Sequence, residues 1–151
     1  MSPESVVLLV VAVLVSQLLL WIPLLRMIRR KTASLRRELA RELTDNGERI
    51  VLGPVPANYR GATSGADYPR AKGNAVVALS DRRLVIRKLV GAGVELSVND
   101  IADIREDKWF LRAYINGRLV TIIKTTSGAE FGFLVDDHAA WMTALRTHVG
   151  P

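Results

Sequence analysis

SVVLLVVAVLVSQLLLWIPLL, residues 5–25, is the stretch that decides the architecture of this 151-residue chain. No charged residue lies between Glu4 and Arg26, and the only polar residues inside the stretch are Ser16 and Gln17. A helix that crosses the hydrocarbon core of a membrane needs about 20 mostly apolar residues. A surface helix of a soluble domain would show a polar face, and this stretch shows none. The stretch therefore predicts a transmembrane helix.

The flanks of this stretch indicate an uncleaved anchor rather than a signal peptide. The apolar run is longer than the apolar region of a secretory signal, and no small-x-small cleavage site follows it. The N-terminal flank, MSPES, has no Lys or Arg, whereas the C-terminal flank is basic. Cytoplasmic flanks carry the excess of basic residues. We therefore predict a single-pass anchor of the cell membrane over residues 5–28, with the N-terminus outside and the following domain cytoplasmic.

Six basic residues follow the apolar run before the next acid, and they equal the formal net charge of +6. The rest of the chain is balanced, so the basic composition describes a segment beside the membrane and gives no reason to expect a nucleic-acid partner. Each basic residue near an anionic leaflet contributes about 1 kcal/mol of attraction. The predicted membrane-surface contact consists of Arg26, Arg29, Arg30, Lys31, Arg36 and Arg37.

Residues 29–47 predict an amphipathic helix beside the membrane. Leu35, Leu39 and Leu43 recur every fourth residue, and Asn46-Gly47 is a helix stop. The stripe is compatible with a helix that lies on the leaflet, with a short coiled-coil seam, or with a plain connector. Lying flat, the leucines would enter the interface. Standing upright, the helix would lift the domain away from the lipid.

Residues 48–149 predict a β domain closed by one helix, because period-two alternation replaces the helical period. We expect Gly53-Pro54-Val55-Pro56 to break or edge the first strand, residues 57–72 to form a loop or irregular strand extension, and Asn116-Gly117 to form a hairpin turn. Asp136 or Asp137 caps a final helix that buries Trp141 and Leu145. The expected strands cover residues 49–52, 75–79, 83–88, 94–98, 101–106, 118–125 and 129–135.

Within this domain an ordered set of stretches resembles a bacterial PH-like domain of the PH/GRAM superfamily. They are NAVVALSDRRLVIRK, VELSVNDIADI, RLVTIIKTTSGAEFGFLV and the helix that bears Trp141. With the anchor, the chain resembles small single-pass PH-domain membrane proteins of bacteria. The resemblance implies seven antiparallel strands in a bent sandwich or barrel, capped by the C-terminal helix. It also implies binding of phospholipid headgroups, peptides or proteins without catalysis.

Two further groups are candidate binding residues. Basic residues at the first hairpin of PH domains clamp phosphates, and Arg70-Ala-Lys72, with Arg60 before it, resembles half of that pattern. The upstream lysine is missing, so a solvated loop is the alternative. Trp109 and Phe110 are adjacent, and adjacent strand residues point to opposite faces. We therefore expect at least one of them to be an exposed, partner-facing aromatic, with core filling as the alternative.

We found no constellation of catalytic, cofactor-binding or metal-ligating residues in the sequence. The chain has no cysteine, and its two histidines, His138 and His148, do not share a helical face. We therefore expect a non-catalytic interaction module that holds a protein partner or complex at the cytoplasmic face of the membrane. The alternatives are a module that binds anionic phospholipid headgroups and an accessory subunit of a membrane transport or enzyme complex.

Overall fold

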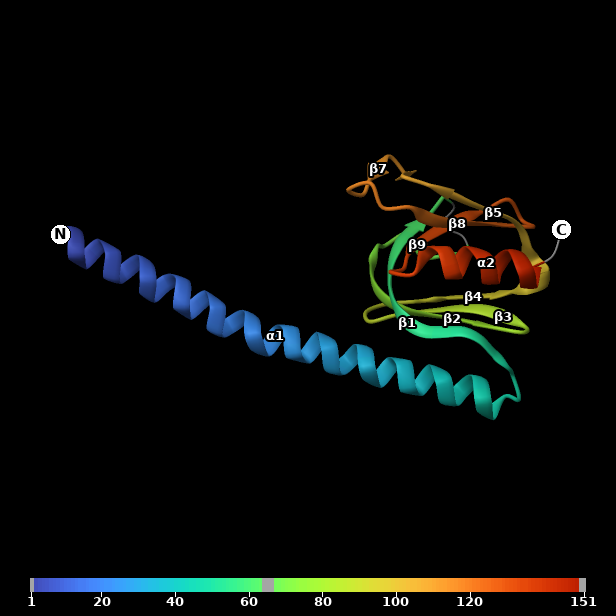
Figure 1. Cartoon of the computed structure of the whole chain (residues 1–151), viewed down its shortest axis with the longest axis horizontal. Coiled ribbons are helices and arrows are strands. Elements are labelled where there is room, and N and C mark those ends of the chain that lie inside the picture. Colours follow the sequence, from blue (N-terminus) through green and yellow to red (C-terminus); the bar gives the residue numbers. More distant parts are fainter. Residues whose placement is uncertain (1, 64–66, 150–151) are drawn as a thin grey trace.

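The computed structural model describes residues 2–63 and 67–149 as one long helix followed by a β domain (Figure 1). Helix α1 spans Pro3–Asp45, and helix α2, near the end of the chain, spans His138–Val149. A short 3-10 helix, η1, spans Val98–Asp100 between β4 and β5. The strands are β1 (Ile50–Ala62), β2 (Gly73–Ser80), β3 (Arg83–Lys88), β4 (Val94–Ser97), β5 (Ile101–Asp107), β6 (Trp109–Phe110), β7 (Ala113–Tyr114), β8 (Val120–Thr125) and β9 (Glu130–Leu134).

Helix α1 joins the two helical segments expected from the sequence into one element. It begins where the Ser2 hydroxyl accepts a hydrogen bond from the Ser5 N–H, with Pro3 in its first turn. It continues through Pro23 without interruption, and it ends at the predicted stop, where the Glu48 N–H bonds to the Leu43 carbonyl. The apolar half is therefore continuous with the half next to the β domain.

Seven strands form one antiparallel sheet in the order β4-β3-β2-β1-β9-β8-β5. β1 is shared by the two halves of the sheet, because its first part pairs with β2 and its last part with β9. The edge strands β4 and β5 are not paired with each other, so the sheet bends without closing into a barrel. The predicted fold class, a long apolar helix and a mainly-β domain with a C-terminal helix, is confirmed in this form.

The first strand is longer than the sequence suggested. β1 passes through Gly53 and Pro54 with two register shifts, and its last residues include the start of the segment expected as a loop. The prediction that this Gly-Pro stretch breaks or edges the strand is therefore wrong, because β1 is continuous and lies between β2 and β9. For residues 57–62 the strand-extension alternative holds. Gly53 has a φ of +83°, and a Cβ there would lie 2.6 Å from the Val77 carbonyl oxygen. A bulge that only glycine fits absorbs the irregularity.

Asn116-Gly117 forms the expected turn, closed by a hydrogen bond from the Arg118 N–H to the Ile115 carbonyl, but no β ladder spans it. β7 pairs with β6 instead, through Trp109 opposite Tyr114, and β8 begins only at Val120. The prediction of a β hairpin at this turn is wrong, because β7, the strand before the turn, pairs with β6 and not with β8.

The core lies inside the bent sheet and is closed at one end by α2 (Figure 1). Trp141 and Leu145 of α2 are buried in it, as predicted, and the Trp141 ring meets Phe133 edge-on with centroids 5.9 Å apart. Of the two candidate caps, Asp137 is the N-cap of α2, because its carboxylate accepts a hydrogen bond from the Ala140 N–H at 3.2 Å.

Candidate membrane-contact site

The N-terminal half of α1 has the length and composition of a membrane span. Its most apolar 18-residue window has a mean hydropathy of 2.7, and none of that window is buried against the rest of the protein. Trp21 lies near its end, before the first arginine. Among residues 2–63 and 67–149, α1 is the one helix that could cross a membrane.

The C-terminal half of α1 is docked on the outer face of the sheet. Leu39 and Leu43 are buried there against Val76, Ala78 and Val85 of strands β2 and β3, and Leu35 and Ile50 pack at the margin of this cluster. The leucine stripe is therefore covered by the protein's own domain, and the leaflet-lying and coiled-coil interpretations of it are wrong in this structure. The sequence held a signal for this contact. Residues 75–79 are apolar without alternation, as in strands covered on both faces.

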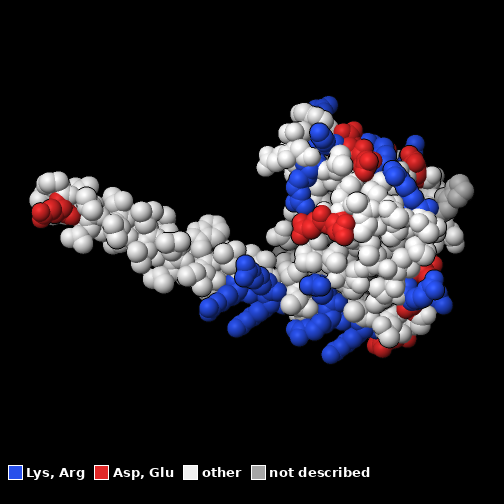
Figure 2. All heavy atoms as spheres, viewed as in Figure 1, with Lys and Arg blue, Asp and Glu red and all other residues white. Residues whose placement is uncertain are grey.

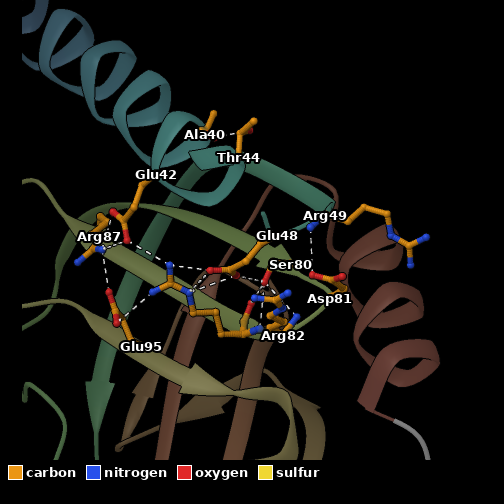
Figure 3. A network of polar contacts seen from close by, with 11 residues as sticks. Ala40, Glu42, Thr44, Glu48, Arg49, Ser80, Asp81, Arg82, Arg87 and Glu95 are labelled. Carbon is orange, nitrogen blue, oxygen red and sulfur yellow. Dashed lines mark hydrogen bonds and ion pairs between the residues drawn. The ribbon is translucent and has the colours of Figure 1, made fainter. Parts of the chain in front are cut away.

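A polar network reinforces this docking (Figure 3). Arg83 pairs with Glu48 at 2.9 Å, with Glu95 at 3.1 Å and with Glu42 of α1 at 3.2 Å. Arg87 binds Glu42 at 2.8 Å and Glu95 at 2.7 Å, which closes the ring of charges. The network therefore joins α1, the turn after it, β3 and β4.

Glu48 is the buried centre of the network, with 5% of its side chain exposed. Its carboxylate also accepts a hydrogen bond from the Ser80 hydroxyl at 2.6 Å. Burial alone would lower the pKa of Arg83, but the charge of Glu48 and its neighbours outweighs burial and raises it. The Arg83 guanidinium therefore remains charged, and the polar network has a structural role.

The six predicted membrane-surface residues all lie on α1, between its apolar half and the docked leucines, and all are exposed. Figure 2 shows a row of basic side chains where the helix approaches the domain. Arg26, Arg30 and Arg37, with Arg41, follow each other at spacings of four, seven and four residues. At 3.6 residues per turn this spacing forms one stripe, opposite the buried leucines. Arg41 is a member that sequence reasoning missed, because it follows the acidic Glu38.

A shallow groove between α1 and β1 lies beside this stripe. Arg36 crosses it and donates from Nε to the Pro54 carbonyl at 3.1 Å. Its two parts are lined by Ala33, Arg36, Arg37, Ala40, Gly53 and Pro54, and by Ile28, Arg29, Thr32, Ala33, Arg36 and Pro56. Three guanidinium groups therefore border an open, otherwise apolar and backbone-lined groove close to the apolar half of α1.

The loop residues predicted as a phosphate clamp do not act as one group. Arg60 is half-buried in β1 and donates to the Asn58 side chain at 3.2 Å, while its Nε is buried without a partner. Arg70 and Lys72 are exposed on the connection before β2. The Tyr59 hydroxyl anchors that connection by donating to the Pro69 carbonyl at 2.8 Å, and burial raises the pKa of Tyr59.

Trp109 and Phe110 point to opposite sides, as expected of neighbours on a strand. Trp109 is 58% exposed and contacts Tyr114, with ring centroids 5.2 Å apart and the ring planes tilted by 41°. Phe110 is only 5% exposed and belongs to a small cluster with Val120, Ile122 and Leu134. Phe110 is thus a core residue, and its assignment as a partner-facing aromatic is wrong.

His138 is a bridging residue at the start of α2. Its Nε2 lies 2.6 Å from a Glu106 carboxylate oxygen, and its Nδ1 lies 3.2 Å from the Thr121 hydroxyl. These contacts hold α2 against β5 and β8. Within the described parts of the chain, no three His, Asp or Glu side chains gather in a way that could hold a metal ion.

Comparison with known proteins gives a fold and no function. No protein-family model and no curated protein matches the chain. A solved structure described as the C-terminal domain of an unknown protein from Leishmania infantum is similar to it, with a TM-score of 0.51 and 16% sequence identity. The match covers 74% of this chain and 94% of that one. At this identity the similarity concerns the fold alone.

Proposed function

We propose that this chain is a non-catalytic, membrane-anchored interaction module that holds a protein partner or complex at the cytoplasmic face of the cell membrane. The observation that carries the proposal is the continuity of α1. The same helix that has the properties of a span runs on without a break, and its last turns are fixed to the domain by Leu39 and Leu43 and by Glu42. A simple tether would not need this rigid attachment, whereas a module that presents a surface at a set height and angle does.

The orientation in this proposal comes from charge. The basic residues lie on the domain side of the apolar half, and no Lys or Arg precedes that half. Excess Lys and Arg mark the cytoplasmic side. A reporter that is active only in the cytoplasm, fused after Pro151, is expected to be active. Activity of an export-dependent reporter at the same position would reverse the orientation.

The PH-like identity of the domain is part of the same proposal. It is supported by the seven antiparallel strands, by β1 bridging both halves of the sheet, and by the closing helix with Trp141. Domains of this kind recognise peptides, proteins or lipids rather than transform substrates. An accessory subunit of a membrane transport or enzyme complex would be one form of such a module.

The test separates rigid presentation from simple tethering. Insertion of four Gly/Ser residues between Lys31 and Thr32 would leave the leucines docked but would uncouple them from the apolar half. We expect the tagged full-length chain, purified in mild detergent, to recover a protein in fixed ratio, and the insertion variant to recover much less. An unchanged ratio would contradict rigid presentation. The absence of any protein in fixed ratio would contradict the partner-holding function.

A second candidate function, binding of anionic phospholipid headgroups, is supported by the groove between α1 and β1. Arg29, Arg36 and Arg37 border it, next to the membrane end of the domain. Guanidinium groups bind phosphate through paired, charge-assisted hydrogen bonds. If a headgroup binds there, Arg36→Lys should weaken binding to anionic vesicles more than Arg70→Lys. Equal effects would remove the reason to assign binding to this groove.

A further inference from the structure

The pairing of strands defines which end of the β domain lies towards the apolar half of α1. β1 runs back along α1, because Gly53 and Pro54 border the groove with Ala40, whereas Pro56 borders it with Ile28. The membrane-proximal end of the sheet is therefore the one level with Pro56 and Asn58 of β1, where this strand passes from β2 to β9.

The same register places the segment between β5 and β8 at this end. Asn58 of β1 pairs with Leu134 of β9, and the neighbouring Phe133 pairs with Thr121 of β8. Val120, the first residue of β8, pairs with Asp107, the last residue of β5. Residues 108–119 therefore leave the sheet and return to it at the membrane-proximal end. In Figure 1 this segment, labelled β7, overhangs towards the side from which the apolar half of α1 extends.

The hairpin of β6 and β7 has one buried and one exposed face. Phe110 fixes the buried face to the sheet, and Ile115 packs beside it. Trp109 and Tyr114 form the other face and are 58% and 51% exposed. Two large aromatic rings are thus held in a fixed position in solvent.

The turn of this hairpin has residues that its backbone disfavours. Leu111 and Arg112 have φ values of +48° and +63°. Two-residue turns with positive φ at both positions prefer Asn-Gly, which the chain uses a few residues later at Asn116-Gly117. An exposed Leu and an Arg in strained backbone are a feature of sites where the side chains serve a purpose other than folding.

All the large apolar side chains that are exposed outside α1 lie at this end of the described domain. They are Val90, in the connection that follows Lys88 of β3, and Trp109, Leu111 and Tyr114 of the hairpin. Single exposed apolar residues are common on protein surfaces. Their confinement to the end from which the apolar helix leaves indicates a common apolar environment.

We propose that the β6–β7 hairpin is a second membrane contact, in which Trp109 and Tyr114 enter the interfacial layer of the leaflet that α1 crosses. Trp and Tyr favour this layer because their rings are apolar and their N–H and O–H groups are polar. The two aromatic rings form the apolar part of this contact, and Arg118 beside the hairpin is paired with Asp136 at 3.1 Å. The inference rests on the proposal that α1 spans the membrane.

The three tryptophans of the chain make the test possible, because Trp21 lies in the apolar half of α1, Trp109 in the hairpin and Trp141 in the core. The full-length protein, W21F, and W21F/W109F are reconstituted in vesicles with and without brominated lipid. We expect quenching to fall in steps from the full-length protein to W21F and again to W21F/W109F. A melting curve of each variant verifies that Trp141 remains in a folded core.

The result that would overturn the inference is equal quenching in W21F and W21F/W109F while the full-length protein is quenched more. In that case α1 spans the membrane but the hairpin faces water or protein. Equal quenching of all three proteins would remove both the span and the second contact. The absence of native cysteine allows a confirming measurement, with a polarity-sensitive dye on Arg112→Cys and, at the opposite end of the sheet, on Ser127→Cys. Only the first should report lipid.

Discussion

The two halves of α1 share one helical backbone and many leucines but differ in what covers them. Before Arg26 the apolar residues surround the helix on all sides, and none is buried by the protein. After Ala33 the leucines form one stripe, and the sheet buries it. The difference lies in the residues between the leucines. In the C-terminal half, charged residues between the leucines restrict apolar contact to one face of the helix. In the N-terminal half, no charged residue interrupts the apolar surface, which suits contact with lipid on every side.

The largest expected effect comes from removing the docked half. A fragment of residues 48–151 exposes Val76, Ala78 and Val85, and it loses Leu39 and Leu43. Each buried leucine side chain contributes about 1.5–3 kcal/mol, against about 5–15 kcal/mol for a whole domain. We expect this fragment to aggregate or melt at low temperature, whereas residues 29–151 should be monomeric and folded. Size-exclusion chromatography and thermal unfolding make the comparison. Equal behaviour would mean that the helix is not part of the domain.

The next effect separates the two halves residue by residue. Leu43 is fully buried, so Leu43→Ala should lower the free energy of unfolding of the domain by about 2–5 kcal/mol. Leu18→Ala, in the apolar half, removes the same atoms from a side chain that no part of the domain contacts, and it should leave domain stability unchanged. Denaturant unfolding of the detergent-solubilised chain measures both. A loss at Leu18 equal to that at Leu43 would contradict the division of α1.

The sequence was sufficient for the parts of the fold that depend on local period. The long apolar helix, the helix stop before Glu48, the strands of the seven-stranded sheet from Ala75 onward and the inward Trp141 all follow from spacing and apolar content. β1 could not be read in this way, because a bulge at Gly53 lets a Gly-Pro stretch remain in a strand. The pairing of Trp109 with Tyr114 was likewise invisible, since its turn uses Leu111 and Arg112 in place of typical turn residues.

The candidate site was predicted in composition but not in arrangement. The six basic residues on α1 were evident from the missing acids. That Arg26, Arg30 and Arg37 form a stripe with Arg41, opposite Leu39 and Leu43, depends on which helical face the sheet covers. The same packing brings Arg36 against Pro54, a contact between residues far apart in the chain. Only tertiary structure reveals such a contact.

A smaller effect is expected at the charge network that holds the docked half of α1 against the sheet. Arg83→Ala would leave the nearly buried Glu48 carboxylate without its partner, which should cost about 2–3 kcal/mol of stability. Arg82→Ala, one residue earlier, changes an exposed side chain and should stay within about 0.5 kcal/mol of the wild type. Thermal unfolding of residues 29–151 compares them. Similar losses in the two variants would mean that the network contributes nothing beyond its surface charge.

The smallest effect per residue is expected on the exposed stripe of α1. Each basic residue near an anionic leaflet contributes about 1 kcal/mol. Arg30→Gln combined with Arg37→Gln should therefore weaken binding of residues 29–151 to anionic vesicles by about 2 kcal/mol, or roughly 30-fold. Arg70→Gln combined with Lys72→Gln removes the same charge from the loop and should change binding less. Vesicle sedimentation measures both double variants.

Salt distinguishes the stripe from a specific lipid site. Exposed charges are screened over about 8 Å at physiological ionic strength and over about 3 Å at 1 M, so binding through the stripe should fall steeply as salt increases. The stripe variant should lose most of that salt dependence, and the loop variant should keep it. The opposite pattern, with salt-resistant binding that disappears when Arg70 and Lys72 are changed, would move the lipid contact from α1 to the loop before β2. The docked half of α1 would then only position the domain, and its basic residues would only set the orientation of the chain in the membrane.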